Sequence, residues 1–590
     1  MERSEGAVDV VEELPARARW LVERLLDHVR QHEPVELTRL GSSERDGELP
    51  DLAAEAMGAR SRDLAVLAAE VDATLARVPA QVDGEQREAR DDLRLLADEL
   101  AYRRFRLDVR PRFVTDPLAA LDTISASIHE LLRRTDGDHE EQCRRLQAAS
   151  ARARRVPHLL EQAGTLLTSS PEPNLEVALR RLPGVVGLVR EELPRRAEQL
   201  ETDVSPARDA GEVAAEGLDA YGALLSELAE EPAGDWRLGA EQHGITRRLA
   251  LGTPMGADEI ERRARAWMDR VRAEMGELAA RSWTRRFPGE PVPADEAERI
   301  RRVLADVADH AVARTELVPE ARRAVEEARA FALASGLTDV PPAERLTVTE
   351  VPPYLQGIAV AFITQAPPLD PSTGCTYYLS PVPDSWDDDQ AASFLREYNP
   401  SQLRSLAIHE GYPGHFVQLE HASRHPRLAR RMLTRPAFAE GWAVYIEREA
   451  LAAGFAAEGS AVDRDDYRMT QRKLELRIAS NALLDVGLHV GDLGDEQALD
   501  LLTTTAFQER AEAEGKLTRA KVTSGQLCSY FVGGEEVGDL RAEVERREGA
   551  EFDLRRFHQR VLSHGTPTVQ VVREALDDDA PVHRPFRQTA

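Results

Sequence analysis

A repeat of apolar residues three and four positions apart runs from the N-terminus to about Gly336. Leu93, Leu96 and Leu100 show this spacing, which places their side chains on one face of a helix. Prolines interrupt the repeat, and a proline inside a helical pattern marks the end of one helix. We therefore predict a mainly α protein with many helices, in one large multi-helical body or two lobes.

The pattern changes between Leu346 and Ser385, where β-branched and aromatic residues stand between Pro and Gly. The strings are LTVTEV, IAVAFIT and CTYYLS, and such short runs are typical of strands. We predict a small sheet or ribbon here. We also expect Cys375–Leu379 to be an edge strand that is free to pair with an extended ligand.

The charge of the chain limits its partners. A formal net charge of -28 gives an acidic surface that repels a phosphate backbone, so we expect no nucleic-acid partner. The N-terminal string MERSEGAVDVVEELPARARW is acidic where a signal peptide needs a basic start, and no run reaches the ~18 apolar residues of a spanning helix. Three widely spaced cysteines supply no disulfide framework. These features predict a cytoplasmic protein with no membrane partner, and they leave its oligomeric state open.

Two histidines and a glutamate occur together in the string HEGYPGHF. His409 and Glu410 match the start of the HExxH zinc signature, in which two histidines four residues apart lie on the same side of a helix. The second histidine here, His415, is six residues from the first. On a regular helix the two side chains would point about 120° apart, too far to bind one ion.

The residues between the histidines contain the means to break this helix. Pro413 cannot donate to the carbonyl of His409 and its ring crowds that carbonyl, while Gly414 accepts the backbone angles of a bulge. The helix should begin at Asn399, because asparagine caps exposed amides and the proline that follows is tolerated at the first helical position. We predict a break near Pro413 that turns His415 back toward His409.

A third metal ligand is expected from the next helix. Glu440 in FAEGWAVYIE lies 25 residues beyond His415, and Gly441 beside it permits two helices to approach closely. Two imidazoles and one carboxylate leave a tetrahedral zinc with an open position for water, and Glu410 can take the proton of that water. We therefore predict about one zinc per chain, bound by His409, His415 and Glu440.

An ordered series of strings resembles a known family. The strings are GCTYYLSP, HEGYPGHF, EGWAVYIE, IASNALLDVGLHVGD, TSGQLCSYFVGG and FDLRRFHQRVLSHG. They resemble bacterial proteins of domain-of-unknown-function family 885 (DUF885), which look like distant relatives of gluzincin zinc metallopeptidases. The resemblance covers roughly Leu346 to the C-terminus and is weaker before it. It implies a mostly helical, zincin-like peptidase fold with zinc at His409, His415 and Glu440. It also implies Glu410 as the catalytic base.

The resemblance points to further positions, namely Tyr377, Asp485, His489, Gln526 and Tyr530. His489 lies four residues after Asp485, so the carboxylate can orient the imidazole. His489 or Tyr530 could donate a hydrogen bond to the oxyanion of a tetrahedral intermediate, and the alternative is that both are buried packing groups. Phe416 stands where the family often has a further histidine, which suggests that this histidine is not an indispensable ligand.

Three other polar residues have a structural interpretation. Glu447 lies seven residues after Glu440 on the same helix face, and we expect it to pair with a charge or support a ligand rather than bind the metal. His558 and His564 lie in a segment whose pattern favours core packing. We assign these two histidines no chemistry.

Together these features predict a zinc-dependent hydrolase of peptide or other amide bonds. Glu410 would activate a metal-bound water that attacks the carbonyl, and a deep helical cleft would select short peptides or small amides. We place a helical lobe that forms one cleft wall at residues 1–340 and the lobe with the metal site and β-ribbon at 341–590, although the two could be one continuous unit. Two alternatives stay open: a metal-dependent lyase or tailoring enzyme acting on a small natural-product precursor, and a helical scaffold without turnover.

Overall fold

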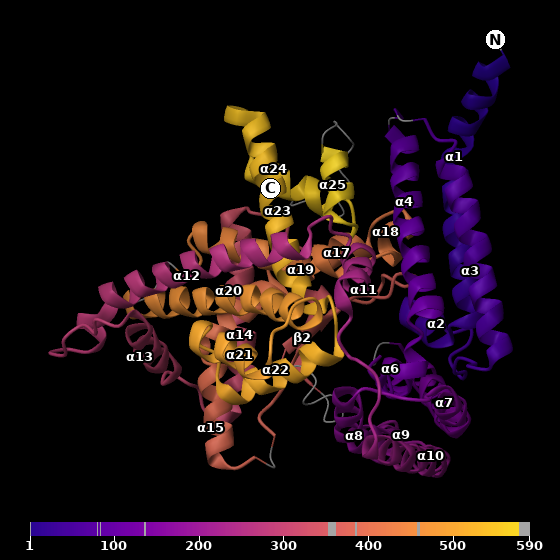
Figure 1. The fold of residues 1–590 in the computed structure, drawn as a ribbon, viewed down its shortest axis with the longest axis horizontal. Coiled ribbons are helices and arrows are strands. Elements are labelled where there is room, and N and C mark those ends of the chain that lie inside the picture. Colours follow the sequence, from indigo (N-terminus) through magenta and orange to yellow (C-terminus); the bar gives the residue numbers. More distant parts are fainter. Residues whose placement is uncertain are drawn as a thin grey trace. The chain divides into compact units, whose positions relative to one another are not determined.

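The computed structural model describes residues 2–79, 81–82, 84–134, 137–351, 361–383, 386–456 and 461–576. Within these residues the protein is mainly helical, as predicted, and has one small sheet (Figure 1). No helix in the described ranges is both long enough and apolar enough to cross a membrane.

The chain forms two compact units. The first is Met1–Trp236 with Pro367–Thr373 and Arg427–Leu433, and the second is Arg237–Ala366 with Gly374–Pro426 and Thr434–Ala590. These bounds differ from the expected lobe boundary at residue 340. The reason is that the helices following Arg237 pack against helices of the second half of the chain, above all α12 (Ala257–Arg286) along α20 (Ala461–His489).

The first unit consists of helices. They are α1 (Glu2–His32), α2 (Pro34–Leu40), α3 (Ala54–Leu75), α4 (Gly84–Arg104), the π-helical turn η1 (Phe105–Val109), α5 (Arg112–Thr115), α6 (Leu118–Leu132), α7 (His139–Leu166), α8 (Glu172–Gly187), the π-helical turn η2 (Leu188–Glu192), α9 (Leu193–Gln199), α10 (Ser205–Glu230) and α18 (Leu428–Met432). α1, α3 and α4 lie side by side, and α10 packs against α7 and α8 (Figure 1). Arg152 of α7 is fully buried and donates to the carbonyls of Glu48 and Ser127, which ties these helices and their connections together.

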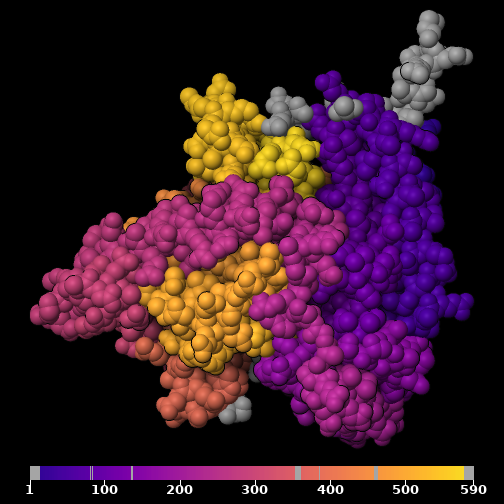
Figure 2. Space-filling view, viewed as in Figure 1, coloured from indigo at the N-terminus to yellow at the C-terminus, as the bar shows by residue number. Residues whose placement is uncertain are grey.

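The second unit contains the remaining helices. Besides α12 and α20 they are α11 (Gly239–Thr246), η3 (Arg247–Leu251), α13 (Glu296–Ala308), η4 (Arg314–Glu316), α14 (Leu317–Ser335), η5 (Ala343–Arg345), α15 (Asp388–Glu397), α16 (Pro400–Leu406), η7 (Ala407–Gly411), α17 (His415–Ser423), α19 (Pro436–Ala452), α21 (Asp495–Asp500), η8 (Leu501–Thr505), α22 (Arg510–Val522), α23 (Gln526–Glu548), η9 (Gly549–Glu551), α24 (Leu554–Leu562) and α25 (Val569–Leu576). On the face drawn in Figure 2, α12 (magenta) and the α21–α22 segment (orange) form adjoining parts of the surface of this unit.

Three strands of the second unit form the small sheet. β1 (Leu346–Glu350), β2 (Ala361–Thr364) and β3 (Cys375–Leu379) are arranged in the order β1-β3-β2. β1 runs parallel to β3 and β2 antiparallel to it, with Tyr377 opposite both Val348 and Ile363. The sheet confirms the predicted β segment, whose residues 352–360 lie outside the described ranges. The expectation that Cys375–Leu379 is an edge strand is wrong. Both sides of its main chain pair with neighbouring strands, so it cannot accept a substrate strand.

α19 lies between two hydrophobic cores of the second unit. Phe438 and Trp442 belong to the core that includes α14, β3, α17 and α24, whereas Ala437 and Val444 belong to the core built around α12, α20 and α23. Packing on two faces fixes both the position and the rotation of α19, because close-packed side chains leave it little freedom to slide.

A pair of glycines brings α19 and α23 together. A Cβ atom on Gly441 would lie 2.6 Å from Cα of Gly533, and a Cβ atom on Gly533 would lie 2.8 Å from Cα of Gly441. Neither position has room for a side chain, so the predicted close approach at Gly441 is confirmed. Because Gly441 contacts Gly533, the neighbouring Glu440 of α19 lies close to the first turns of α23.

Candidate metal centre

The helix that carries His409 is broken, as predicted. Asn399 caps its start, with Oδ1 accepting from the amide of Gln402 at 3.2 Å. α16 then widens into the π-helical turn η7, which the amide of Tyr412 closes by donating to the carbonyl of Ala407 at 3.0 Å. A new helix, α17, begins at His415.

Two contacts explain why the break occurs after Gly411. A Cβ atom on Gly414 would lie 2.7 Å from the carbonyl carbon of His409 and closer still to its oxygen, so only glycine fits there. The indole Nε1 of Trp442 donates to the carbonyl of Pro413 at 3.1 Å. This carbonyl therefore has a partner on α19 in place of a helical amide, which holds the broken segment against the next helix.

The break brings the three predicted ligands together. The rings of His409 and His415 lie 4.7 Å apart, nearly perpendicular to each other. Their Nε2 atoms lie 3.6 Å and 3.3 Å from Oε2 of Glu440, respectively. Each residue thus offers one donor atom within 4.8 Å of the other two.

The polar surroundings of Glu440 fit a metal ion. Its Oε2 atom is buried and has no hydrogen-bond partner, although it faces two imidazole nitrogens. A buried carboxylate oxygen without a partner is costly, and a cation held between it and the two rings would remove that cost. Two imidazoles and a carboxylate are a donor set that zinc prefers. The side chain of Glu440 as a whole is 24% exposed, although its Oε2 atom is buried.

A second carboxylate on α19 orients His409. Nδ1 of His409 donates to Oε1 of Glu447 at 2.5 Å, and Glu447 is buried. This bond fixes the tautomer in which Nε2 is free to bind an ion. Burial alone would lower the pKa of His409, but Glu440 and Glu447 raise it well above its usual value. The site therefore favours positive charge on or beside this ring.

Glu410 is placed to exchange a proton beside these groups. Its side chain is buried, and burial raises the pKa of this carboxyl above its usual value, opposed by the nearby His415 and His409. A raised pKa makes the carboxylate a better proton acceptor at neutral pH than an exposed glutamate.

Two tyrosine hydroxyls lie near the carboxylates of the site. The charge of Glu440, together with burial, raises the pKa of Tyr530, whose side chain also contacts Arg519. Tyr377 of β3 is fully buried, its hydroxyl has no hydrogen-bond partner, and burial together with Glu410 raises its pKa well above the usual value. Both phenols therefore stay protonated and can donate hydrogen bonds.

The profile of one protein family, described as "Bacterial protein of unknown function (DUF885)", matches residues 34–576. The chain belongs to the DUF885 family. The match extends into the helical first half, where the sequence strings alone gave a weaker resemblance. No curated protein matches the chain.

Two solved structures are similar to this DUF885 protein over nearly their whole length. One is described as a "putative lipoprotein of unknown function" from Shewanella oneidensis, with 25% identity, a TM-score of 0.77, and coverage of 95% of this chain and 99% of that chain. The other is described as a "putative lipoprotein" from Colwellia psychrerythraea, with 17% identity, a TM-score of 0.76, and coverage of 96% and 98%. The second likeness shows the fold alone.

In this DUF885 protein the carboxylate of Asp485 bonds to groups other than the imidazole of His489, which it was expected to orient. Oδ1 of Asp485 lies 2.7 Å from Nε2 of His243, and Oδ2 accepts from the amide of Gly525 at 2.8 Å. Nε2 of His489 lies 2.8 Å from the carbonyl oxygen of Ala520, and the ring is buried. These bonds tie α20 to α11, α22 and the start of α23, which favours the packing alternative for His489. Its catalytic role stays a prediction.

The remaining predicted positions divide between core and surface. His558 is fully buried, with Nδ1 donating to the carbonyl of Leu337 and Nε2 accepting from the Tyr445 hydroxyl, both at 2.8 Å, in agreement with its structural interpretation. Phe416 packs edge-on against Tyr412 in the core. Gln526 is exposed at the first position of α23.

Proposed function

We propose that this DUF885 protein is a zinc-dependent hydrolase of peptide or other amide bonds, with a zincin-like, gluzincin-type active site. His409, His415 and Glu440 would hold one zinc ion. The observation that carries the proposal is the convergence of two imidazole Nε2 atoms on a buried Glu440 oxygen that lacks a hydrogen-bond partner. A bound zinc would supply a Lewis acid that polarises a carbonyl and acidifies a water molecule.

Glu410 would act as the catalytic base. Its raised pKa suits a group that takes a proton from water and returns it to the departing amine. Burial next to the two histidines keeps its carboxyl close to the reacting atoms and limits competing hydrogen bonds with bulk water.

Tyr530 would stabilise the negative charge that develops on the carbonyl oxygen. Its phenol stays protonated beside Glu440, so it can donate to an oxyanion without first losing its own proton. Arg519 contacts the same phenol, and its charge would strengthen the donor.

Short peptides and small amides are the proposed substrates. Zinc chemistry of this kind acts on a polarised carbonyl, and a formal net charge of -28 disfavours a nucleic-acid partner. We also propose a cytoplasmic location, as the sequence suggests.

A peptide library offered to the zinc-loaded full chain tests the proposal. Mass spectrometry should detect paired products whose summed mass exceeds that of the substrate by one water, with release of a free amine. Glu410→Gln should keep zinc but reduce turnover about 100-fold to 10,000-fold, because an amide cannot accept the proton. Glu449→Gln, on α19, is the matched control and should retain activity. Elimination products in place of hydrolysis, or normal turnover by Glu410→Gln, would overturn the proposal.

A further inference from the structure

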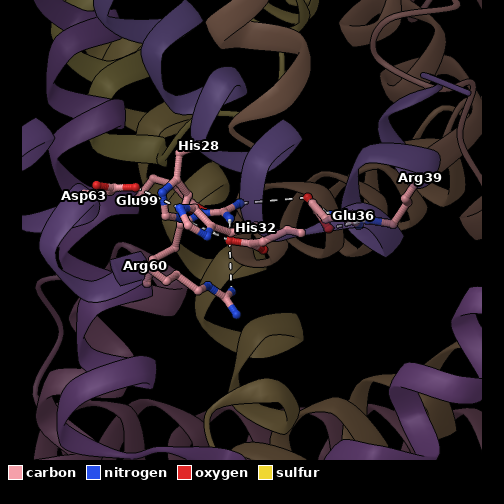
Figure 3. A network of polar contacts seen from close by, with 9 residues as sticks. His28, His32, Glu36, Arg39, Arg60, Asp63 and Glu99 are labelled. Atoms are coloured by element: carbon pink, nitrogen blue, oxygen red, sulfur yellow. Dashed lines mark hydrogen bonds and ion pairs between the residues drawn. The ribbon is translucent and has the colours of Figure 1, made fainter. Parts of the chain in front are cut away.

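A second group of metal-binding side chains lies within the first unit. His28 and His32 are four residues apart on α1, and Asp63 is on α3. A spacing of four places both histidines on one face of the helix. One donor atom from each of the three residues lies within 4.8 Å of the other two. Figure 3 shows the three side chains coming together among several charged groups.

His28 is buried without a hydrogen bond. Only 6% of the residue is exposed, and neither ring nitrogen has a hydrogen-bond partner. Oε1 of Glu33 lies 3.5 Å from its Nε2, but that oxygen already pairs with Arg60 at 2.9 Å and accepts from Arg103 at 3.0 Å. A buried imidazole in this condition loses its bonds to water and gains only a 3.5 Å contact with an oxygen that two guanidinium groups already share, so it points to a missing partner.

A metal ion could reach His28 from solvent on the side of Asp63. Nε2 of His32 lies 2.8 Å from Oδ2 of Asp63, and the ring of His32 lies 4.8 Å from the ring of His28. The side chain of Asp63 is 49% exposed, whereas that of His32 is only 10% exposed. The group is therefore closed on the histidine side and open to solvent at the carboxylate, which allows an ion to enter and water to complete its coordination.

The charges around the group also favour a cation. Three carboxylates and three guanidinium groups form the surrounding ion pairs, namely Glu33, Glu36 and Glu99 with Arg39, Arg60 and Arg103. Figure 3 labels Glu36, Glu99, Arg39 and Arg60 among them. Among these described groups the opposite charges balance in number. Asp63 then adds a negative charge whose partner is the ring of His32, so a divalent ion would meet a site of net negative charge.

We propose that His28, His32 and Asp63 form a second metal site, which binds a divalent transition metal such as zinc with water completing the coordination. Two imidazoles and one carboxylate are the same donor set as at the first centre. Binding would replace the proton shared by His32 and Asp63 and would give one ring nitrogen of His28 a partner. The ion would also link α1 to α3.

A third cluster in the chain does not have these properties. His243, Asp485 and Cys528 also lie within 4.8 Å of one another. Both oxygens of Asp485 are already bonded, one to His243 and one to the amide of Gly525. All three residues are buried, so no carboxylate is open to solvent. This cluster is a satisfied packing network.

Zinc titration of the full chain against a chelator tests the second site. The titration uses a chain carrying His409→Ala and His415→Ala, which lacks two ligands of the first centre. This chain should still bind about one zinc. Loss of a residue that only hydrogen-bonds to a metal ligand lowers metal affinity by up to about 100-fold. Because His32 is a proposed ligand itself, adding His32→Ala should lower zinc affinity by more than this. His158→Ala, which alters an exposed histidine of the same unit, is the matched control and should change nothing.

Asp63→Asn provides a milder test, because Asp63 is half exposed and its replacement spares the core. It should weaken zinc binding while circular dichroism and the thermal midpoint of the metal-free chain stay the same. X-ray absorption of the zinc-loaded chain with the first centre removed should show two imidazole ligands. The proposal is overturned if that chain takes up no zinc, or if neither His32→Ala nor Asp63→Asn alters its zinc affinity.

Discussion

Oε1 of Glu447 lies 2.5 Å from Nδ1 of His409, while Nε2 of the same ring faces Oε2 of Glu440 at 3.6 Å. The two glutamates are seven residues apart on α19, so one face of one helix contacts both nitrogens of the ring. One carboxylate therefore orients the imidazole and the other is placed to share an ion with it.

This arrangement predicts the effect of Glu447→Gln. A glutamine amide binds Nδ1 less strongly than a carboxylate does, so His409 loses part of its orientation and basicity. Zinc affinity should fall about 10-fold to 100-fold, as for other carboxylates behind a ligating histidine. Glu449→Gln, two residues further along α19, should leave zinc affinity unchanged. Competition with a fluorescent chelator measures both, and equal affinities in the two variants would show that Glu447 has no such role.

Gly414 offers a test of the helix break. Alanine at this position would collide with the carbonyl of His409, so the segment must rearrange and His415 must move. Gly414→Ala should lower zinc affinity without lowering helical content. In Gly411→Ala the new methyl group would meet only the side chain of Val325 at 4.0 Å, so this nearby variant should bind zinc normally. A Gly414→Ala chain with normal zinc affinity would contradict the account of the break.

The crossing of α19 and α23 predicts a stability difference between two glycines of one helix. Gly533→Ala places a methyl group against the backbone of α19, and overpacking of this kind costs about 3 kcal/mol of unfolding free energy. At Gly538 an added Cβ atom meets nothing within 4 Å, so Gly538→Ala should be neutral or slightly stabilising. Urea unfolding of the two variants measures the difference. Similar midpoints would mean that the helices are not held this closely.

Local chemistry explains what the sequence predicts correctly at this centre. Asn399, Pro413 and Gly414 each act within a few residues of themselves, so the helix start and the break could be inferred from the string alone. The place of Glu440 near the two histidines could be inferred because Gly441 beside it indicates that two helices cross there.

Long-range relations explain what the sequence does not predict. The central place of β3 depends on which strands pair with it, and no residue within Cys375–Leu379 encodes that choice. His243 meets Asp485 from a distant part of the chain, with no local signal. The spacing of His28 and His32 in HVRQH was a visible signal for a metal site, but nothing in the sequence connects Asp63 to it.

His558 predicts a pH dependence of stability. Burial lowers its pKa from 6.5 to about 4 in the folded chain, so the unfolded chain binds the proton more readily. The neutral form of His558 contributes fully to the free energy of unfolding above pH 6.5, and this contribution is lost as the pH falls toward 4. At about 1.4 kcal/mol per pKa unit, the loss is roughly 3 kcal/mol. Unfolding free energy measured across this range should fall less steeply in His558→Gln. The same slope in both chains would contradict the assignment.

Zinc binding by a chain that lacks the second site tests the central claim most directly. In the His32→Ala background the second site has lost one of its three proposed ligands, and His409, His415 and Glu440 are the only complete proposed set. Elemental analysis after dialysis should find about one zinc per chain, and adding either His415→Ala or Glu440→Ala should remove it. Full zinc occupancy in both of these variants would contradict the metal centre.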